Sequence, residues 1–431
     1  MKGSEYAEKL LQLVEEGVSP FHVTAAVEER LKEAGFEELF LRNDWGLDYG
    51  GKYYVKHHDS SLFAFTIGTE TDYFPSLRIA AAHTDFPSLR IKPNPEVVTE
   101  GYMQLNVEVY GGAILNTWLD RPLSVAGRVA LKSEDPFHPK MRLVNIRRPI
   151  LTIPNLAIHM NREVNKGVEL NRQTDMEPIM GMVTEELNRD GFFMEFLAGE
   201  LHVASEDILD FELNLYNTDT GDYVGMNQDF ISAPRLDNLT GVQAVLTGIL
   251  EEDNRRNIHM AAFFDHEEIG SRTKQGAGSN ILGILSERIF LGLGHSRERY
   301  LGRLEEGLLL SVDVGHALHP NYVNKNDPTN RGLLNRGLLI KEAAAQSYAT
   351  DCEAVGIVMQ LCQKEHIAYQ KFANRSDGTS GGTLGSIASA MLPVRTVDIG
   401  VPLLAMHSAR ELMGTQDQEA LTRLIRAFFS L

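Results

Sequence analysis

The chain has 431 residues, of which 43% are hydrophobic and 23% charged, a balance typical of a folded globular protein with two or three domains. Its formal net charge of -18 argues against a nucleic-acid partner, because phosphate backbones bind basic surfaces. The sequence has no apolar run of about 18 residues that could span a membrane. It also has no glycine-rich phosphate loop after an expected strand, so nucleotide binding has no support.

Two helices, a hairpin and a strand are predicted near the N-terminus. Residues 1–10 lack the apolar core of a signal peptide. Residues 5–18 carry apolar side chains at helical spacing, and residues 19–35 begin with Ser-Pro and close on Gly, which are helix start and stop signals. Residues 52–68 indicate a hairpin, and residues 77–85 indicate a short apolar strand that ends in polar residues.

The pattern becomes β-rich from about residue 92 to 232. Residues 102–112 alternate between apolar and polar side chains, as a half-buried antiparallel strand does. Residues 124–131, 147–159 and 210–217 add strand-like segments with polar turns between them. We therefore expect residues 92–232 to form an inserted β-rich domain.

Strands alternate with helices again after residue 233. The expected elements are, in order, a helix over 238–252, strands over 258–265, 307–315 and 337–342, a helix over 350–365, a strand over 395–408 and a helix over 417–431. Such alternation predicts an α/β fold with a mixed, mostly parallel sheet and helices on both faces. Residues 1–91 and 233–431 are expected to form this one discontinuous domain.

The helix over 350–365 carries both cysteines of the chain. Thr350 with Glu353 three residues later predicts a capping box at its start. Cys352 and Cys362 are separated by ten residues of helical rise, about 15 Å, which is too far for a disulfide bond. Two unpaired cysteines indicate a reduced, cytoplasmic setting.

Polar side chains follow several expected strands, at the ends where open α/β sheets carry their functional groups. A single His there is more often structural, but five segments share the pattern. They supply His83 and Asp85, Asp237, Glu267 and Glu268, Asp313 with His316 and His319, and His407.

This set of side chains points to metal-assisted hydrolysis. His and carboxylate ligands suit Zn²⁺, Co²⁺ or Mn²⁺. More carboxylates are present than one ion needs, which favours two ions about 3.5–4 Å apart with one shared Asp and a bridging hydroxide. Glu267 beside Glu268 suits a general base next to a ligand. The H-E-x-x-H pattern of helical zinc proteases is absent.

Seven segments match the motifs of a known family. They are "AAHTDFPSLRIKPNP", "VEVYGGAILNTWLDR", "IPNLAIHMNR", "RLDN", "DHEEIGS", "HALHPNY" and "RTVDIGVPLLAMHSARE". They occur in order from about residue 81 to 411 and together resemble the M18 metallo-aminopeptidases, the aspartyl aminopeptidase group. The match is most specific at "IPNLAIHMNR" and "DHEEIGS".

The resemblance implies two metal ions per subunit, most often zinc, with Asp237 as the shared ligand. His83 and Asp313 complete one site in this comparison, and Glu268 and His407 complete the other. It also implies a zinc-exopeptidase-like catalytic domain with an inserted dimerisation domain, assembled through dimers into a dodecamer.

Further roles come from the same resemblance. Glu267 corresponds to the general base, and Asp85 to a residue that orients the imidazole of His83. His159, on the inserted domain, corresponds to a residue that reaches the active site of a neighbouring subunit. Its alternative is a surface or interface His without a catalytic part.

The resemblance also implies a set of substrate-binding residues. His316 and His319 correspond to residues that stay off the metals and hold the substrate or the tetrahedral intermediate; their alternative is a capping role in the loop. The counterpart of Lys341 pairs with an acidic substrate side chain, and Tyr348 is retained near it. A solvated Lys at a strand end is the alternative for Lys341.

Several positions depart from the family pattern near this pocket. Ala345 and Ser347 replace an Asn and an Arg, Gly378 and Ser380 replace a larger residue and a Cys, and Phe86 replaces a small residue. None of these is an expected metal ligand. The departures leave two specificities open, for Asp and Glu or for neutral N-terminal residues.

The sequence thus predicts a cytoplasmic dinuclear metallo-aminopeptidase that acts on peptides with a free N-terminus and associates with itself. One alternative is a related dimetal amidohydrolase or deacylase, which would not need the free α-amine. Another is a non-catalytic assembly or cargo protein. The presence of Glu267 beside every expected ligand favours catalysis.

Overall fold

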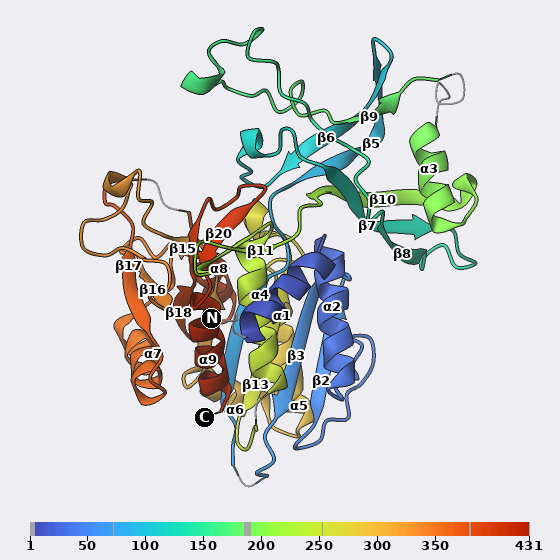
Figure 1. Cartoon of the computed structure of the whole chain (residues 1–431). Helices are drawn as coiled ribbons and strands as arrows, with labels where there is room; N and C mark the ends of the chain where they lie inside the picture. The colour runs from blue at the N-terminus through green and yellow to red at the C-terminus, as the bar shows by residue number, and fades with distance from the viewer. Residues whose placement is uncertain (1–4, 72, 185–190, 252, 379–380, 431) are drawn as a thin grey trace. The chain divides into compact units, whose positions relative to one another are not determined.

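The computed structural model describes residues 5–71, 73–184, 191–251, 253–378 and 381–430, which group into two compact units (Figure 1). The first unit contains Met1–Asp85, Gly221–Met406 and Glu411–Leu431. The second contains Phe86–Thr220 and the short return segment His407–Arg410.

The first unit is built on a nine-stranded mixed sheet within the described residues. Its strands, in spatial order, are β1 (Glu37–Glu38), β2 (Lys52–His57), β3 (Ser61–Ile67), β13 (Ile258–Phe264), β4 (Leu77–His83), β14 (Leu308–Val312), β18 (Arg395–Gly400), β16 (Leu338–Glu342) and β17 (Tyr369–Ala373). Four central strands, β13, β4, β14 and β18, run parallel to one another. Phe264 at the end of β13 pairs with His83 at the end of β4. Their carboxyl ends therefore meet at one edge of the sheet.

Helices cover both faces of this sheet. They are α1 (Glu5–Glu16), α2 (Pro20–Glu33), α4 (Leu236–Leu250), α5 (Ile281–Gly292), α6 (Arg297–Leu304), α7 (Cys352–Lys364), α8 (Leu384–Met391) and α9 (Asp417–Phe429). Apolar side chains of α5, α6 and α8 share one buried core with alternate residues of β3, β4 and β13. On the other face α4 packs on β4 and β13, with α1 and α9 against it (Figure 1). The predicted α/β fold, with a mixed sheet and helices on both faces, is confirmed.

A smaller five-stranded sheet also belongs to the first unit. Its order is β11 (Asp222–Val224), β12 (Phe230–Ala233), β20 (Glu411–Gly414), β19 (Pro402–Leu404) and β15 (Gly315–His316). Strands β11 and β12 were expected in the inserted domain, whereas β11 pairs with β12 and β12 pairs with β20 near the C-terminus. Residues 395–408 were expected to form one strand, but they form β18 and β19 in different sheets.

The second unit is an antiparallel sheet with one helix, α3 (Phe192–Leu201), packed against its core. The strands, in spatial order, are β8 (Lys140–Asn145), β7 (Leu123–Leu131), β10 (Ile208–Asn217), β5 (Ser88–Thr99), β6 (Tyr102–Tyr110) and β9 (Ile179–Met182). Short 3₁₀ turns add η1 (Leu115–Thr117), η2 (Val164–Lys166) and η3 (Ser205–Asp207).

Two local predictions are wrong. Residues 147–159 form only isolated bridges at Leu151 and Thr152, because Pro149 and Pro154 have no N–H to donate to a sheet. Helix α7 is capped by Asp351, whose side chain accepts the N–H of Ala354 at 2.9 Å.

Thr350 therefore does not cap α7. Its hydroxyl instead accepts the backbone N–H of Asp398, at 3.0 Å. Across the described residues, no helix is both long enough and apolar enough to cross a membrane.

Candidate metal centre

Three buried side chains of the first unit converge at the carboxyl ends of the parallel strands. Nε2 of His83 lies 3.4 Å from Oδ1 of Asp237 and 3.5 Å from Oδ1 of Asp313. One potential ligand atom from each residue falls within 4.8 Å of the other two. Burial opposes a charge on His83, but Asp237, Asp313 and Asp85 outweigh it and raise the imidazole pKa well above its usual value. The carboxylates thus create a buried site that favours a cation.

The backbone explains how these side chains meet. His83 is the last residue of β4, and Asp313 comes directly after β14, its neighbour in the sheet. Asp237 stands in the first turn of α4, where its backbone N–H donates to Oε2 of Glu411 at 2.9 Å and its peptide bond to Asn238 is cis. The three side chains therefore come from separate, well-packed elements of one domain.

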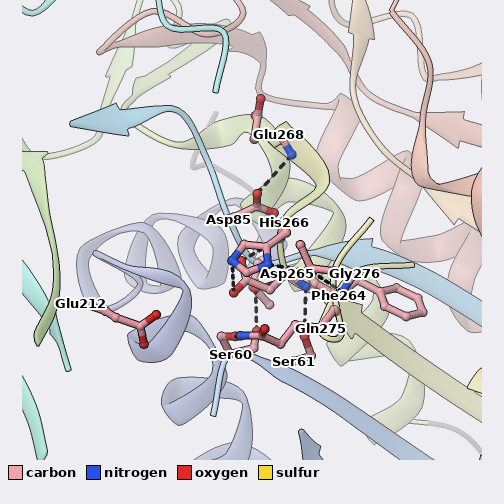
Figure 2. A network of polar contacts seen from close by, with 12 residues as sticks. Ser60, Ser61, Asp85, Glu212, Phe264, Asp265, His266, Glu268, Gln275 and Gly276 are labelled. Atoms are coloured by element: carbon pink, nitrogen blue, oxygen red, sulfur yellow. Dashed lines mark hydrogen bonds and ion pairs between the residues drawn. The ribbon is translucent and has the colours of Figure 1, made fainter. Parts of the chain in front are cut away.

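Asp85 connects His83 to the turn that carries Glu267 and Glu268. Figure 2 shows its bond to the backbone of Glu268. Its two carboxylate oxygens accept the backbone N–H groups of Glu267 and Glu268, each at 3.1 Å. Nδ1 of His83 lies 3.4 Å from the Asp85 carboxylate and 3.0 Å from the Asp85 carbonyl oxygen. When Nδ1 carries the proton, Nε2 presents its lone pair toward Asp237 and Asp313.

The strand before this turn ends in a polar network (Figure 2). The backbone N–H of Asp265 donates to Oγ of Ser61, and Nε2 of Gln275 donates to Oγ of Ser60. The next residue, His266, has positive φ and leads into η4 (Glu267–Ile269). These bonds hold the turn that presents Glu267 and Glu268.

Glu267 and Glu268 occupy different surroundings. Part of Glu267 remains exposed, yet the loss of water around its carboxyl raises its pKa to about 8; His83 opposes this rise, and Asp313 adds to it. A carboxyl with a raised pKa can hold a proton near neutral pH and can also release it. Glu268 offers a ligand oxygen within 4.8 Å of one on Asp237. Asp237 therefore lies between two sets of donors.

His407 begins the return segment that clusters with the second unit. Its Nδ1 lies 3.2 Å from the carbonyl oxygen of Gly112 in the same unit. A proton on Nδ1 can be donated to this carbonyl, which leaves Nε2 as the coordinating nitrogen. Its assignment as a ligand stays a prediction.

Lys341 is wholly buried, with 0% of its surface exposed. Its ammonium donates to the carbonyl oxygens of Asp313 and Val314, both at 3.0 Å, and lies 4.0 Å from Oδ2 of Asp313. It also lies 5.0 Å from the ring centre of Tyr348, whose hydroxyl accepts Nδ2 of Asn374. Burial opposes its charge, but Asp313 and Asp398 outweigh that and raise the Lys341 pKa. Lys341 therefore braces the strand end that carries Asp313.

The remaining predicted residues lie elsewhere. His316 is exposed on β15, and His319 accepts the N–H of Asn321 and packs on the Tyr322 ring. His159 is exposed in the second unit.

The departures from the family pattern are also located. Phe86 is buried, Ala345 and Gly378 are exposed, and Ser347 accepts the N–H of Thr383 through its carbonyl. Ser380 lies outside the described residues.

Two buried carboxylates near the centre were not singled out from the sequence. Glu411 holds the backbone of Asp237, and Asp398 accepts Oγ1–H of Thr383 and the N–H of Ala349. Both stand in the motif "RTVDIGVPLLAMHSARE", but their partners are distant in the chain, so the motif alone signals only their presence.

The donor set fits divalent metal ions. The imidazole of His83 and the nearby carboxylates of the first unit, most of them buried, match the ligands that zinc and related ions prefer. Without a cation, the close approach of Asp237, Asp313 and Asp85 around one imidazole would be costly.

Comparisons with known proteins agree with this chemistry. The family described as aminopeptidase I zinc metalloprotease (M18) matches residues 13–429. The probable M18 family aminopeptidase 2 of Clostridium novyi is 44% identical over 428 residues, covering 99% of each chain. A cryo-EM structure of an Ape4 and Nbr1 complex matches with a TM-score of 0.94 at 34% identity, covering 98% of this chain and 85% of that one. A structure described as the S. cerevesiae mApe1 dodecamer matches the fold with a TM-score of 0.83 at 23% identity, covering 99% and 96%.

Proposed function

The chain belongs to the M18 family of zinc metallo-aminopeptidases, and on that basis we propose that it removes single N-terminal residues from peptides at a centre of two divalent ions. The position of Asp237 is the observation that supports a second ion. Asp237 has a ligand atom within 4.8 Å of atoms on His83 and Asp313, and it also has one within 4.8 Å of a Glu268 oxygen. A carboxylate between two donor sets can bridge two ions, as dinuclear hydrolases require.

His407 is proposed as the fifth ligand, on the side of Glu268. Support comes from its tether within the chain. Strand β19 ends at Leu404 and β20 begins at Glu411, and both strands belong to the first unit. Glu411 itself accepts the N–H of Asp237, so the backbone of His407 is four residues from a contact of the centre. The contact between its Nδ1 and a carbonyl suits a ligand that binds through Nε2.

Bound divalent ions would polarise the scissile carbonyl and lower the pKa of the attacking water. Glu267 would take the proton from this water and give it to the leaving amine. Asp85 keeps Glu267 and Glu268 in place through their backbone N–H groups. Lys341 fixes the backbone after Asp313, so that this ligand does not move during turnover.

Asp and Glu are proposed as the preferred N-terminal residues. The family resemblance and the buried charge of Lys341 beside the centre support this preference. A second candidate is a preference for neutral residues. It is favoured by the complete burial of Lys341, because an acidic substrate side chain would have to compete with two backbone acceptors for its ammonium.

Self-association belongs to the proposal as well, through dimers to a dodecamer, with His159 reaching the active site of a neighbouring subunit. Exposed apolar side chains around it in the second unit support an interface there: Leu156, Ile158 and Met160. A cytoplasmic setting is supported by the two free cysteines, Cys352 and Cys362.

A substrate panel tests this function. We expect the purified protein to hydrolyse aminoacyl-peptides with a free N-terminus, to lose activity on chelation and to regain it with Zn²⁺, Co²⁺ or Mn²⁺. Comparing peptides that begin with Asp, Glu or a neutral residue determines the specificity. Equal cleavage of N-acylated substrates would instead indicate a deacylase, and no cleavage at all in the metal-loaded protein would indicate an assembly protein.

A further inference from the structure

A cavity of about 570 Å³ lies in the first unit, a short distance along the chain from the proposed centre. Its wall includes His316, which follows the ligand Asp313 by three residues and therefore lies at most about 10 Å from it. From there the cavity extends past β17 and β19 to the loop that contains η5 (Val323–Lys325). The cavity wall thus includes a residue that is close to the proposed chemistry.

The lining of this cavity combines an apolar wall with cations. Phe372 and Leu403 provide buried apolar surface. Lys325 and Arg375 provide positive charge in a protein whose formal net charge is -18. The same wall contains one carboxylate, Asp327, so the two cations are the groups of the lining that can receive an anionic group.

The acidic groups near the cavity already have partners. Asp327, which lines it, accepts the backbone N–H groups of Thr329 and Asn330, and these bonds lower its pKa to about 2. Asp377 forms two hydrogen bonds with the guanidinium of Arg375, through Nε at 2.7 Å and Nη2 at 2.6 Å. Arg375 therefore keeps Nη1 for another acceptor, and its planar group is held in one orientation.

We infer that this cavity binds the part of the peptide that follows the scissile bond, and that Lys325 and Arg375 recognise its C-terminal carboxylate. The inference rests on the proposed function and names how the leaving peptide is held. Apolar side chains of that peptide pack on Phe372 and Leu403. Short peptides are therefore bound at both ends, by the centre at the first residue and by the cavity at the last.

The size of the cavity separates this role from binding of the first side chain. The side chain of the N-terminal residue is attached next to the scissile carbonyl, so it has to stay close to the metal ligands. A cavity of about 570 Å³ is the size of a site for a whole small ligand, which is far larger than one Asp or Glu side chain.

The test compares one tripeptide, Asp-Ala-Ala, with its C-terminal amide. For the wild-type protein we expect the free acid to have about fivefold lower KM than the amide, the upper range for a partly exposed ion pair. Lys325→Ala and Arg375→Ala should each reduce that ratio toward one. Lys364→Ala, which removes an exposed cation of α7 outside the cavity, should keep the ratio.

Binding measured by calorimetry on the Glu267→Gln variant repeats the comparison without turnover. Equal affinity for acid and amide in the wild type, or an equal loss for both in the variants, would overturn the inference. If the variants instead changed the preference between peptides that begin with Asp and peptides that begin with Ala, the cavity would bind the N-terminal side chain. That result would also overturn the inference. Failure of the proposed function differs from these results, because then neither peptide is cleaved by the metal-loaded wild type.

Discussion

The two units of the molecule use their strands in different ways. In the first, the parallel strands β4, β13 and β14 run in the same direction, so their carboxyl ends present polar residues at one edge. In the second, every paired strand of the sheet is antiparallel, so successive ends point in opposite directions. Within the described residues, His83, Asp237 and Asp313 form a group in the first unit that could hold a metal ion, whereas exposed apolar side chains occur in both units.

The comparison suggests a division of labour. Parallel strands concentrate charge, and the cost of burying it is offset by a cation or by a proton. The second unit offers Met160 at 74% exposure on a segment without regular structure, which suits an interface with another subunit. Substitutions in the first unit are therefore expected to reduce catalysis, and substitutions in the second unit are expected to reduce self-association.

The largest effect is expected for Glu267→Gln in the first unit. Because the amide cannot accept the proton of the attacking water, kcat should fall by about 10³-fold. Steady-state kinetics with an unblocked peptide measures this, and metal analysis should find the wild-type metal content. Glu298→Gln, at an exposed position of α6, is the matched control. Wild-type kcat in Glu267→Gln would contradict the mechanism.

Lys341→Met tests the buried charge beside the centre. The substitution leaves Asp398 without its nearby cation, so the free energy of unfolding should fall by about 3–5 kcal/mol. Urea denaturation of the metal-free protein measures it. Lys364→Met at the exposed end of α7 should change stability by less than about 0.5 kcal/mol. Equal stability of both variants would show that Lys341 does not brace this site.

Asp85→Asn should weaken the centre without removing a ligand. Its new amide nitrogen cannot accept the N–H of Glu267 or Glu268, and its contact with His83 changes. We expect metal affinity or kcat/KM to fall by about 10- to 100-fold, as for other partners of metal-binding His residues. Titration with a competing chelator is the measurement, and unchanged affinity together with unchanged kcat/KM would contradict it.

Asp417 provides a buried carboxyl of the first unit that has no expected metal. Burial raises its pKa to about 7, against the hydrogen bonds it accepts from Asn335 and Gly337. The folded protein therefore binds more protons than the unfolded chain between about pH 4 and 7, and stability falls as pH rises through that range.

Asp417→Asn should remove this contribution. The difference in unfolding free energy between wild type and variant should change with pH by at most about 1.4 kcal/mol per unit. Denaturant titrations at several pH values, with and without added metal, measure this difference. If this difference depended on pH without metal but no longer did so with metal added, Asp417 would belong to the centre.

The smallest effect on folding is expected in the second unit. Met160→Ser replaces a side chain that is already in solvent, so stability should change by less than about 0.5 kcal/mol. Sedimentation velocity should nevertheless show a shift toward smaller species. An unchanged assembly would remove this segment from the interface.

The fold class could be predicted because alternation of strands and helices follows directly from apolar periodicity. The site could be predicted in outline because parallel strands end together, which led from separate motifs to His83, Asp237 and Asp313 in one place.

Long-range pairing explains what the sequence analysis missed. Strands β11 and β12 depend on β20, nearly two hundred residues away, and Glu411 depends on Asp237 at a similar separation. The cap of α7 is a local error of one residue, because Thr350 and Asp351 are both good caps and only the bond from Asp398 to Thr350 distinguishes them. Pro149 and Pro154 did carry a local signal against a strand at 147–159.

Counting the metal ions bound per chain tests the proposed dinuclear centre most directly. Native mass spectrometry combined with elemental analysis should find two divalent ions per chain in the wild type. Asp237→Asn, which removes the shared ligand, should lose both, whereas Glu268→Gln should retain the ion held by His83 and Asp313. One ion in the wild type, or two in Asp237→Asn, would contradict a dinuclear centre bridged by Asp237.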